Sequence, residues 1–309
     1  MTRIAILALL ASVLSPLASA QDTPKDKVLR GDANCTRCHD ENDSFPVLAI
    51  GKTKHGTRAD PRTPSCTSCH GASEAHMNHK SGSGAPPRPK PDVSFSKVSK
   101  TPYEARTQVC MTCHQGSSRI DWQMSAHARQ DVTCSSCHAV HAARDPVRDK
   151  LAQSDTCFAC HKEQRVQVHR PVHHPIPEGK MSCSSCHNVH GGNPKQLVRD
   201  SVNETCYLCH AEKRGPFVHS HPPVQEDCSI CHQPHGTTIP SLLKSRAPFL
   251  CQECHSHASH PGQAGALPSG RTTSSSLLGS VARGCMNCHT NIHGSNSKEN
   301  AATSGRFRR

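Results

Sequence analysis

Aromatic residues and long apolar stretches are scarce in this sequence of 309 residues. It contains one Trp, two Tyr and six Phe, and the apolar fraction of 34% already includes every cysteine. Its mean hydropathy is −0.61. Such a chain buries too little apolar surface to offset the conformational entropy lost on folding. The composition therefore excludes an ordinary globular domain whose core is made of side chains alone.

No cysteine stands outside one motif, Cys-x-x-Cys-His. Ten copies with two cysteines each account for all 20 cysteines. A disulfide framework does not require a His after every second Cys. A zinc ribbon needs two Cys-x-x-Cys units per metal and no adjacent His, and thioredoxin-like chemistry needs a single motif in a βαβ setting. The pattern instead predicts ten attachment sites for haem c, with two thioether bonds and one axial His at each.

Ten haems would supply the apolar core that the side chains lack. The predicted fold is a multihaem cytochrome c: mostly coil with short α-helices, little or no β-structure, and an elongated row of haems as its core. Folding is expected to be coupled to haem attachment, as metal binding is in small metalloproteins. The covalent attachment residues are Cys35, Cys38, Cys66, Cys69, Cys110, Cys113, Cys134, Cys137, Cys157, Cys160, Cys183, Cys186, Cys206, Cys209, Cys228, Cys231, Cys251, Cys254, Cys285 and Cys288.

The formal net charge of +12 would ordinarily suggest an anionic partner. Each haem adds two propionates and about one positive charge at its ferric iron, so ten oxidised haems bring the total close to neutral. The sequence also has no basic patch interleaved with aromatic residues. We therefore expect no nucleic-acid partner, and the basic side chains are expected to neutralise propionates.

Residues 1–20 resemble a secretory signal peptide. Arg3 precedes an apolar run from Ile4 to Leu14, and Ala18 and Ala20 form a small-residue cleavage signal. The run is too short for a spanning helix, and no second run of spanning length follows. We expect a decahaem domain over 21–309 in the periplasm, where haem c is attached.

The motifs recur in pairs with a period of about 47 residues, which indicates stacked modules. Five two-haem modules are predicted, with two pentahaem halves as a coarser division. Polar segments at 80–100 and 261–284, rich in Gly, Pro and Ser, are expected to be loops or linkers. The basic tail at 296–309 is expected to be mobile.

The 25 histidines exceed the ten that the motifs use. The motif histidines are the predicted proximal ligands: His39, His70, His114, His138, His161, His187, His210, His232, His255 and His289. Matching the modules selects ten distal candidates: His55, His76, His127, His141, His174, His190, His221, His235, His260 and His293. The histidines left without an assigned iron are His79, His169, His173, His219 and His257. The sequence barely distinguishes His174 from His173, or His221 from His219, as the distal candidate.

Ten bis-His irons would have low reduction potentials and no open coordination position for a substrate. Multihaem reductases keep at least one open iron, often marked by an irregular motif, and all ten motifs here are regular. The histidine count therefore favours electron transfer over catalysis, with no catalytic residues.

Longer stretches around the motifs resemble the MtrA, DmsE, MtoA and PioA family of periplasmic decahaem cytochromes. They include Lys54-His55-Gly56, Asp131-Val-Thr-Cys-Ser-Ser-Cys-His138 and Cys285-Met-Asn-Cys-His-Thr-Asn-Ile-His-Gly-Ser295, and the match spans essentially the whole mature chain. The resemblance implies an extended haem wire inside an outer-membrane β-barrel porin of the MtrB or PioB kind. It also implies electron exchange with periplasmic or inner-membrane cytochromes, and with a surface multihaem cytochrome or terminal reductase.

Three functions follow as alternatives. The first is a conduit across the outer membrane, which would serve extracellular metal or sulfoxide reduction, or ferrous iron oxidation in the opposite direction. The second is a soluble periplasmic electron shuttle or store. The third, a multihaem reductase, is disfavoured by the regular motifs and the sufficient histidines.

Overall fold

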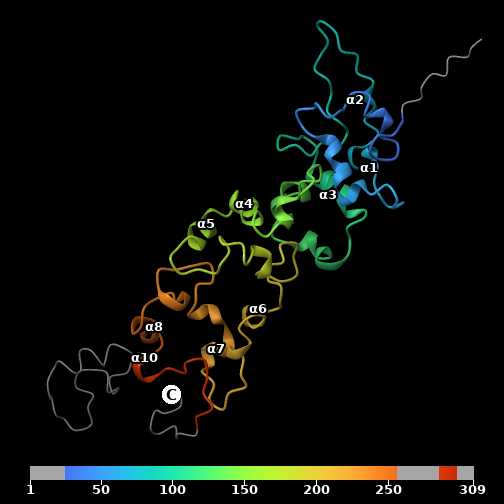
Figure 1. Ribbon diagram of the computed structural model, residues 1–309. Helices are drawn as coiled ribbons and strands as arrows, with labels where there is room; N and C mark the ends of the chain where they lie inside the picture. The colour runs from blue at the N-terminus through green and yellow to red at the C-terminus, as the bar shows by residue number, and fades with distance from the viewer. Residues whose placement is uncertain (1–24, 256–284, 298–309) are drawn as a thin grey trace, which may run out of the picture.

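The computed structural model describes residues 25–255 and 285–297, which form an elongated body (Figure 1). The chain runs along this body from the N-terminal motifs at one end to the C-terminal motifs at the other. The expected signal peptide at 1–20, the linker at 261–284 and residues 298–309 of the expected tail lie outside the described residues.

Secondary structure in the described residues consists of short helices separated by coil. The longest α-helix has 9 residues. The α-helices are α1 (Cys66–His70), α2 (Glu74–Met77), α3 (Tyr103–Met111), α4 (Gln153–Phe158), α5 (Lys162–Val168), α6 (Val202–Cys206), α7 (Pro222–Glu226), α8 (Phe249–Gln252) and α10 (Cys285–Cys288). The 3₁₀ turns are η1 (Asp32–Asn34), η2 (Val47–Lys52), η3 (Lys54–Gly56), η4 (Ser117–Arg119), η5 (Trp122–Met124), η6 (Ala128–Gln130), η7 (Cys134–Ser136), η8 (Pro146–Arg148), η9 (Cys183–Ser185), η10 (Ala211–Lys213), η11 (Cys228–Ile230) and η12 (Pro240–Leu242).

Each motif forms one helical turn. The amide of the motif His donates to the carbonyl of the first Cys, as in His114 to Cys110 at 2.9 Å and His187 to Cys183 at 2.9 Å. Residues four apart on a helix share one face. The turn therefore presents the first thiol and the imidazole on the same side of the backbone, which is the arrangement that the haem attachment motif requires.

The two motifs of a pair begin differently. The first motif of the middle pairs continues a helix, as Cys110 does in α3 and Cys157 in α4. The second motif starts its own turn, because the amide of the preceding residue donates to a serine hydroxyl inside the motif. Ser65 donates to Ser68 at 3.0 Å, and Thr133 to Ser136 at 3.2 Å. The same hydroxyl-capped turn begins at Ser182, which donates to Ser185 at 3.1 Å.

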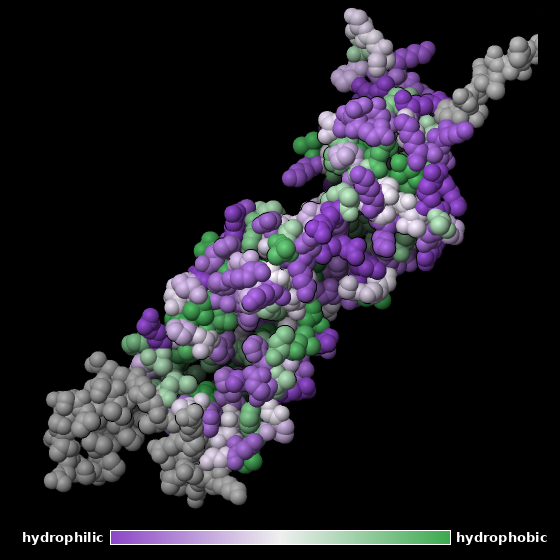
Figure 2. Space-filling model, viewed as in Figure 1, coloured by the Kyte–Doolittle hydropathy of each residue, from purple (hydrophilic) through white to green (hydrophobic). Residues whose placement is uncertain are grey.

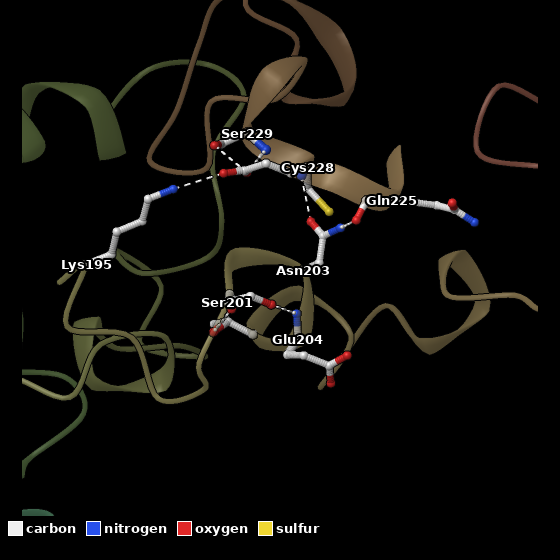
Figure 3. A network of polar contacts seen from close by, with 9 residues as sticks. Lys195, Ser201, Asn203, Glu204, Gln225, Cys228 and Ser229 are labelled. Atoms are coloured by element: carbon white, nitrogen blue, oxygen red, sulfur yellow. Dashed lines mark hydrogen bonds and ion pairs between the residues drawn. The ribbon is translucent and has the colours of Figure 1, made fainter. Parts of the chain in front are cut away.

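A buried amide ties the two motifs of one pair together (Figure 3). Asn203 on α6 accepts from the backbone amide of Cys228 at 2.7 Å and donates to the carbonyls of Val224 and Gln225. Lys195, from the preceding pair, forms an ion pair with Asp227 at 2.9 Å. Gln153 plays the same part in its own pair, accepting from the amide of Ser184 at 2.9 Å.

Sheet structure and an apolar core are nearly absent from the part of the chain that the structure describes. Isolated bridges join Val172 to Thr237 and His219 to Ser295, with two more inside loops. The buried apolar side chains are few: Leu29, Ile50, Trp122, Ala128, Phe158 and Val168. Figure 2 shows hydrophobic residues in small groups along the body, separated by hydrophilic ones. The predicted fold class, short helices and coil around a haem core, is confirmed.

Within the described residues, no helix has the length and apolarity needed to span a bilayer.

We expect the chain to be unfolded when it is made without haem, because the few buried apolar side chains cannot offset the entropy of ordering so long a coil. Circular dichroism and thermal unfolding of the haem-free and matured proteins provide the measurement. The matured protein should show a cooperative transition, and a cooperative transition in the haem-free chain would contradict this prediction.

Candidate haem sites

The ten motifs are numbered as sites 1 to 10 in chain order, and the rings of nine motif histidines face a predicted distal histidine. The centroids of the paired rings lie 5.9 to 6.4 Å apart. The pairs, from site 1 to site 9, are His39 with His76, His70 with His141, His114 with His55, His138 with His190, His161 with His127, His187 with His235, His210 with His174, His232 with His293, and His255 with His221.

This spacing fits one iron between two imidazoles. Iron–nitrogen bonds of about 2 Å on each side, plus about 1 Å from each nitrogen to its ring centroid, separate two axial rings by about 6 Å. At site 10, the motif residue His289 lies within the described part of the chain, whereas its predicted partner His260 lies outside it, as does the spare His257.

The outer nitrogen of many of these rings is held by an oxygen acceptor. His141 Nδ1 donates to the carbonyl of Val47 at 2.7 Å, and His174 Nδ1 to that of Pro234 at 2.8 Å. His138 Nδ1 lies 2.7 Å from a carboxylate oxygen of Asp145. With Nδ1 carrying the proton, Nε2 has its lone pair free for a metal. The donor set therefore fits bis-His haem.

Burial further favours neutral rings at several sites. Desolvation is the largest cause that lowers the pKa of His55, His190 and His235 below the usual value of an imidazole. A second imidazole close by lowers it further, because two positive rings repel each other. These rings are consequently neutral at pH 7, the form that binds iron.

Hydrogen bonds separate the two close choices at site 7. His174 faces the His210 ring, whereas neighbouring His173 has both ring nitrogens occupied, Nδ1 by the carbonyl of Arg170 and Nε2 by Glu178 at 3.1 Å. At site 9 the ring of His221 faces His255. His219 instead forms a backbone bridge with Ser295. The spare His169 packs against Phe158.

The distal histidines cross between neighbouring motif pairs. His55, in the spacer of the first pair, faces His114 of the second pair, and His141, just after the second pair, faces His70 of the first. The hydrogen bond from His141 to Val47 joins the two exchanging segments. The junction is thus crossed by one predicted ligand in each direction.

The same reciprocal junction recurs three more times. Between the second and third pairs, His127 and His190 cross, and His127 Nδ1 donates to Val189 at 3.1 Å. Between the third and fourth pairs, His174 and His235 cross beside the Val172–Thr237 bridge. Between the fourth and fifth pairs the crossing ligands are His221 and His293, beside the His219–Ser295 bridge. Site 1 alone among the described pairs takes its distal ring from within its own pair.

Cysteine contacts place consecutive sites next to one another. Within a pair, the first cysteines of the two motifs lie close enough for one thiol to shift the pKa of the other. In the second pair this contact raises the pKa of the Cys110 thiol and lowers that of Cys134 to about 7. The five contacts of this kind are Cys35–Cys66, Cys110–Cys134, Cys157–Cys183, Cys206–Cys228 and Cys251–Cys285.

Between pairs, the second cysteines approach instead. Burial is the main cause that raises the pKa of the Cys69 thiol, and the charge of nearby Cys113 raises it further. The contacts of this kind are Cys69–Cys113, Cys137–Cys160, Cys186–Cys209 and Cys231–Cys254. Within the described part of the chain, no disulfide joins these cysteines. The two kinds of contact alternate and link all ten sites in chain order.

Comparison with known proteins finds families of c-type cytochromes. A family described by a doubled CXXCH motif matches residues 173–215 and 221–260, and a family of NrfB-like c-type cytochromes matches 66–152. The multihaem cytochrome MtrA of Shewanella baltica (strain OS185) is 40% identical over 276 residues, which cover 86% of this chain and 79% of the relative. The chain belongs to the MtrA family. As a member of the MtrA family it is a multihaem c-type cytochrome that binds haem covalently and transfers electrons, and it is not an enzyme.

Sequence reasoning missed the role of the segment 80–100. It is coil, as expected, but its carbonyls orient two predicted ligands: Pro89 accepts from His76 at 2.8 Å and Val93 accepts from His70 at 2.9 Å. Asp92 also accepts from the amide of Ser73 at 2.8 Å. The clustered prolines of this segment could have indicated this role. Proline has no amide hydrogen, so carbonyls near it are left to accept hydrogen bonds from side chains.

Replacing His174 with Ala should open the iron of site 7, because its ring is the one that faces His210. The His173→Ala variant is the matched control, since both nitrogens of that ring have other partners. The measurement is the ferric electron paramagnetic resonance (EPR) spectrum, in which an open site gives a high-spin signal. A high-spin signal in His173→Ala but not in His174→Ala would contradict the assignment.

The ring planes predict two classes of low-spin ferric signal. The planes are nearly perpendicular at site 3, at 89°, and at site 5, at 86°, whereas they are nearly parallel at site 4, at 8°. Perpendicular axial imidazoles give highly anisotropic spectra and parallel ones give rhombic spectra. The His55→Ala and His127→Ala variants should each remove one anisotropic component. Retention of both components in either variant would refute the pairing.

Proposed function

We propose that the chain carries ten bis-His haems in single file and conducts electrons across the outer membrane inside a β-barrel porin. The observation that carries the proposal is the unbroken alternation of cysteine contacts, which links each site to the next. When bound, each haem supplies a centre that accepts and releases one electron. The elongated body supports a path that runs from one end of the molecule to the other (Figure 1).

The proposed ligands at each site are the two motif cysteines, the motif histidine and the distal histidine that faces it. Nine sites have this set within the described residues, and we assign His260 to site 10 because it is the predicted candidate left over. Two nitrogen ligands close each iron to substrates and hold its potential low. That arrangement supports transfer between centres and disfavours a reductase.

A porin partner follows from the surface and from the family resemblance. The described chain is mostly coil, and many hydrophilic residues lie on the face in view (Figure 2). Unpaired backbone groups cannot face hydrocarbon without a large free-energy cost. A barrel with a polar lumen can enclose such a chain across the bilayer. We propose periplasmic or inner-membrane cytochromes as partners at one end and a surface multihaem cytochrome or terminal reductase at the other. The proposed location is the periplasm, in association with the outer membrane.

A soluble periplasmic shuttle is the second candidate. The reciprocal junctions hold the sites in order without a barrel, and this order would serve a freely diffusing carrier equally well. The two candidates differ only in whether the protein has a membrane partner.

The conduit predicts transfer of electrons through a sealed membrane. Vesicles enclosing reduced methyl viologen would be prepared with the co-expressed cytochrome and barrel, and ferric citrate would be added outside. Enclosed viologen should oxidise rapidly, whereas vesicles holding the barrel alone should retain their electrons. Failure of the cytochrome to co-purify with the barrel, together with no viologen oxidation, would favour the shuttle.

A further inference from the structure

The segment 117–127 lies across three consecutive sites in the N-terminal half. The Arg119 side chain is within electrostatic reach of His114 at site 3 and His190 at site 4. The Trp122 ring lies 6.0 Å from the His190 ring. The same segment then provides His127 to site 5.

Two polar donors in this segment are buried with no hydrogen-bond partner among the described residues. Trp122 is 6% exposed, and its Nε1 is one of these atoms; Arg119 Nε is the other. Indole and guanidinium nitrogens only donate hydrogen bonds, so each needs an acceptor. Natively buried donors nearly always have one.

The nearby carboxylate does not fill this need. Asp121 lies against the backbone of Gly191 and Gly192, where a Cβ on Gly191 would come within 2.6 Å of the Asp121 carbonyl oxygen. Gly191 also has a φ of +114°, which only glycine adopts readily. Asp121 therefore packs against the loop after motif 6, and the two unpaired donors belong to side chains that lie near the predicted ligands of sites 3 and 4.

We propose that Arg119 and Trp122 bind haem propionates at sites 3 and 4 and raise the reduction potentials of these two sites. The inference rests on the proposed haem loading. Propionates are anionic acceptors, and guanidinium is the side chain that pairs best with carboxylates. Positive charge beside a haem stabilises its reduced form, and so does donation to a propionate, which offsets negative charge.

The consequence is an uneven distribution of electrons along the path. Sites 3 and 4 would fill before their neighbours and act as a small electron store within the N-terminal half. Arg119 contributes a full charge at the junction of the two sites, whereas Trp122 acts at site 4 through a single hydrogen bond. The two residues should therefore affect different sets of sites.

Redox titration followed by EPR separates these effects, using the isolated holo-cytochrome without a barrel. Site 3 belongs to the perpendicular class and site 4 to the parallel class. Arg119→Gln should lower the reduction potential of one component in each class. The expected shift is about tenfold in the one-electron equilibrium constant, which is about 59 mV. Trp122→Phe keeps an aromatic side chain but removes the N–H. It should lower the reduction potential of one parallel component only. Arg119→Lys keeps the charge and should restore most of the shift.

The matched control is Arg129→Gln, which removes the same charge from an exposed position on the adjacent turn η6. Each variant is first checked for a full haem content and a low-spin spectrum. Unchanged potentials in both Arg119→Gln and Trp122→Phe, or a shift in Arg129→Gln as large as in Arg119→Gln, would overturn the proposal. Because no membrane is involved, failure of the conduit would leave this result intact, and loss of low-spin signals in the unsubstituted protein would instead refute the haem loading.

Discussion

The facing of two imidazoles, seen within the described residues at nine of the ten predicted haem sites, is the interaction on which the rest of this structure depends. The ring centroids keep one spacing, 5.9 to 6.4 Å, at nine sites whose surroundings differ in sequence and helix content. Few apolar side chains are buried, so coordination and the haem faces must replace packing between side chains. The short helices serve this purpose, since each holds one motif in a single turn rather than building a helical bundle.

Because the ligands cross between motif pairs, the molecule is not a string of independent modules. In most repeat proteins each unit contacts its neighbours through packed surfaces. Here each junction also exchanges ligands, so that loss of His141 would affect the first pair, and loss of His55 the second. A division into two pentahaem halves meets the same constraint, since site 4 takes its partner His190 from beyond motif 6. A boundary placed anywhere between motifs 5 and 6 would therefore leave site 4 of the first half with a predicted ligand from the second half.

Much of the candidate site could be predicted from the sequence. The haem attachment motif is a local pattern, and the number of candidate axial histidines can be counted in the sequence alone. The assignment of each distal ring could not be predicted, since it depends on the path of the chain. His141 illustrates the reason. It follows His138 by three residues and would be the nearest choice for site 4, yet two residues on one turn cannot reach opposite faces of the same iron. The ring is therefore available only to a neighbouring site, and the structure places it against His70. The choice between His173 and His174 likewise depends on which nitrogens the fold has already used.

The alternation of the cysteine contacts bears on how the proposed path would behave. Each internal site lies beside its pair partner through its first cysteine and beside the adjacent pair through its second, as Cys110 lies beside Cys134 while Cys113 lies beside Cys69 of the preceding pair. Among the described residues, these neighbours follow the order of the motifs, so the proposed path would run as a single file. The contacts also have the same form when followed from either end. The cysteine neighbours therefore set no direction by themselves, and the direction of net flow along the proposed path would be set by the potentials of the partners at its two ends.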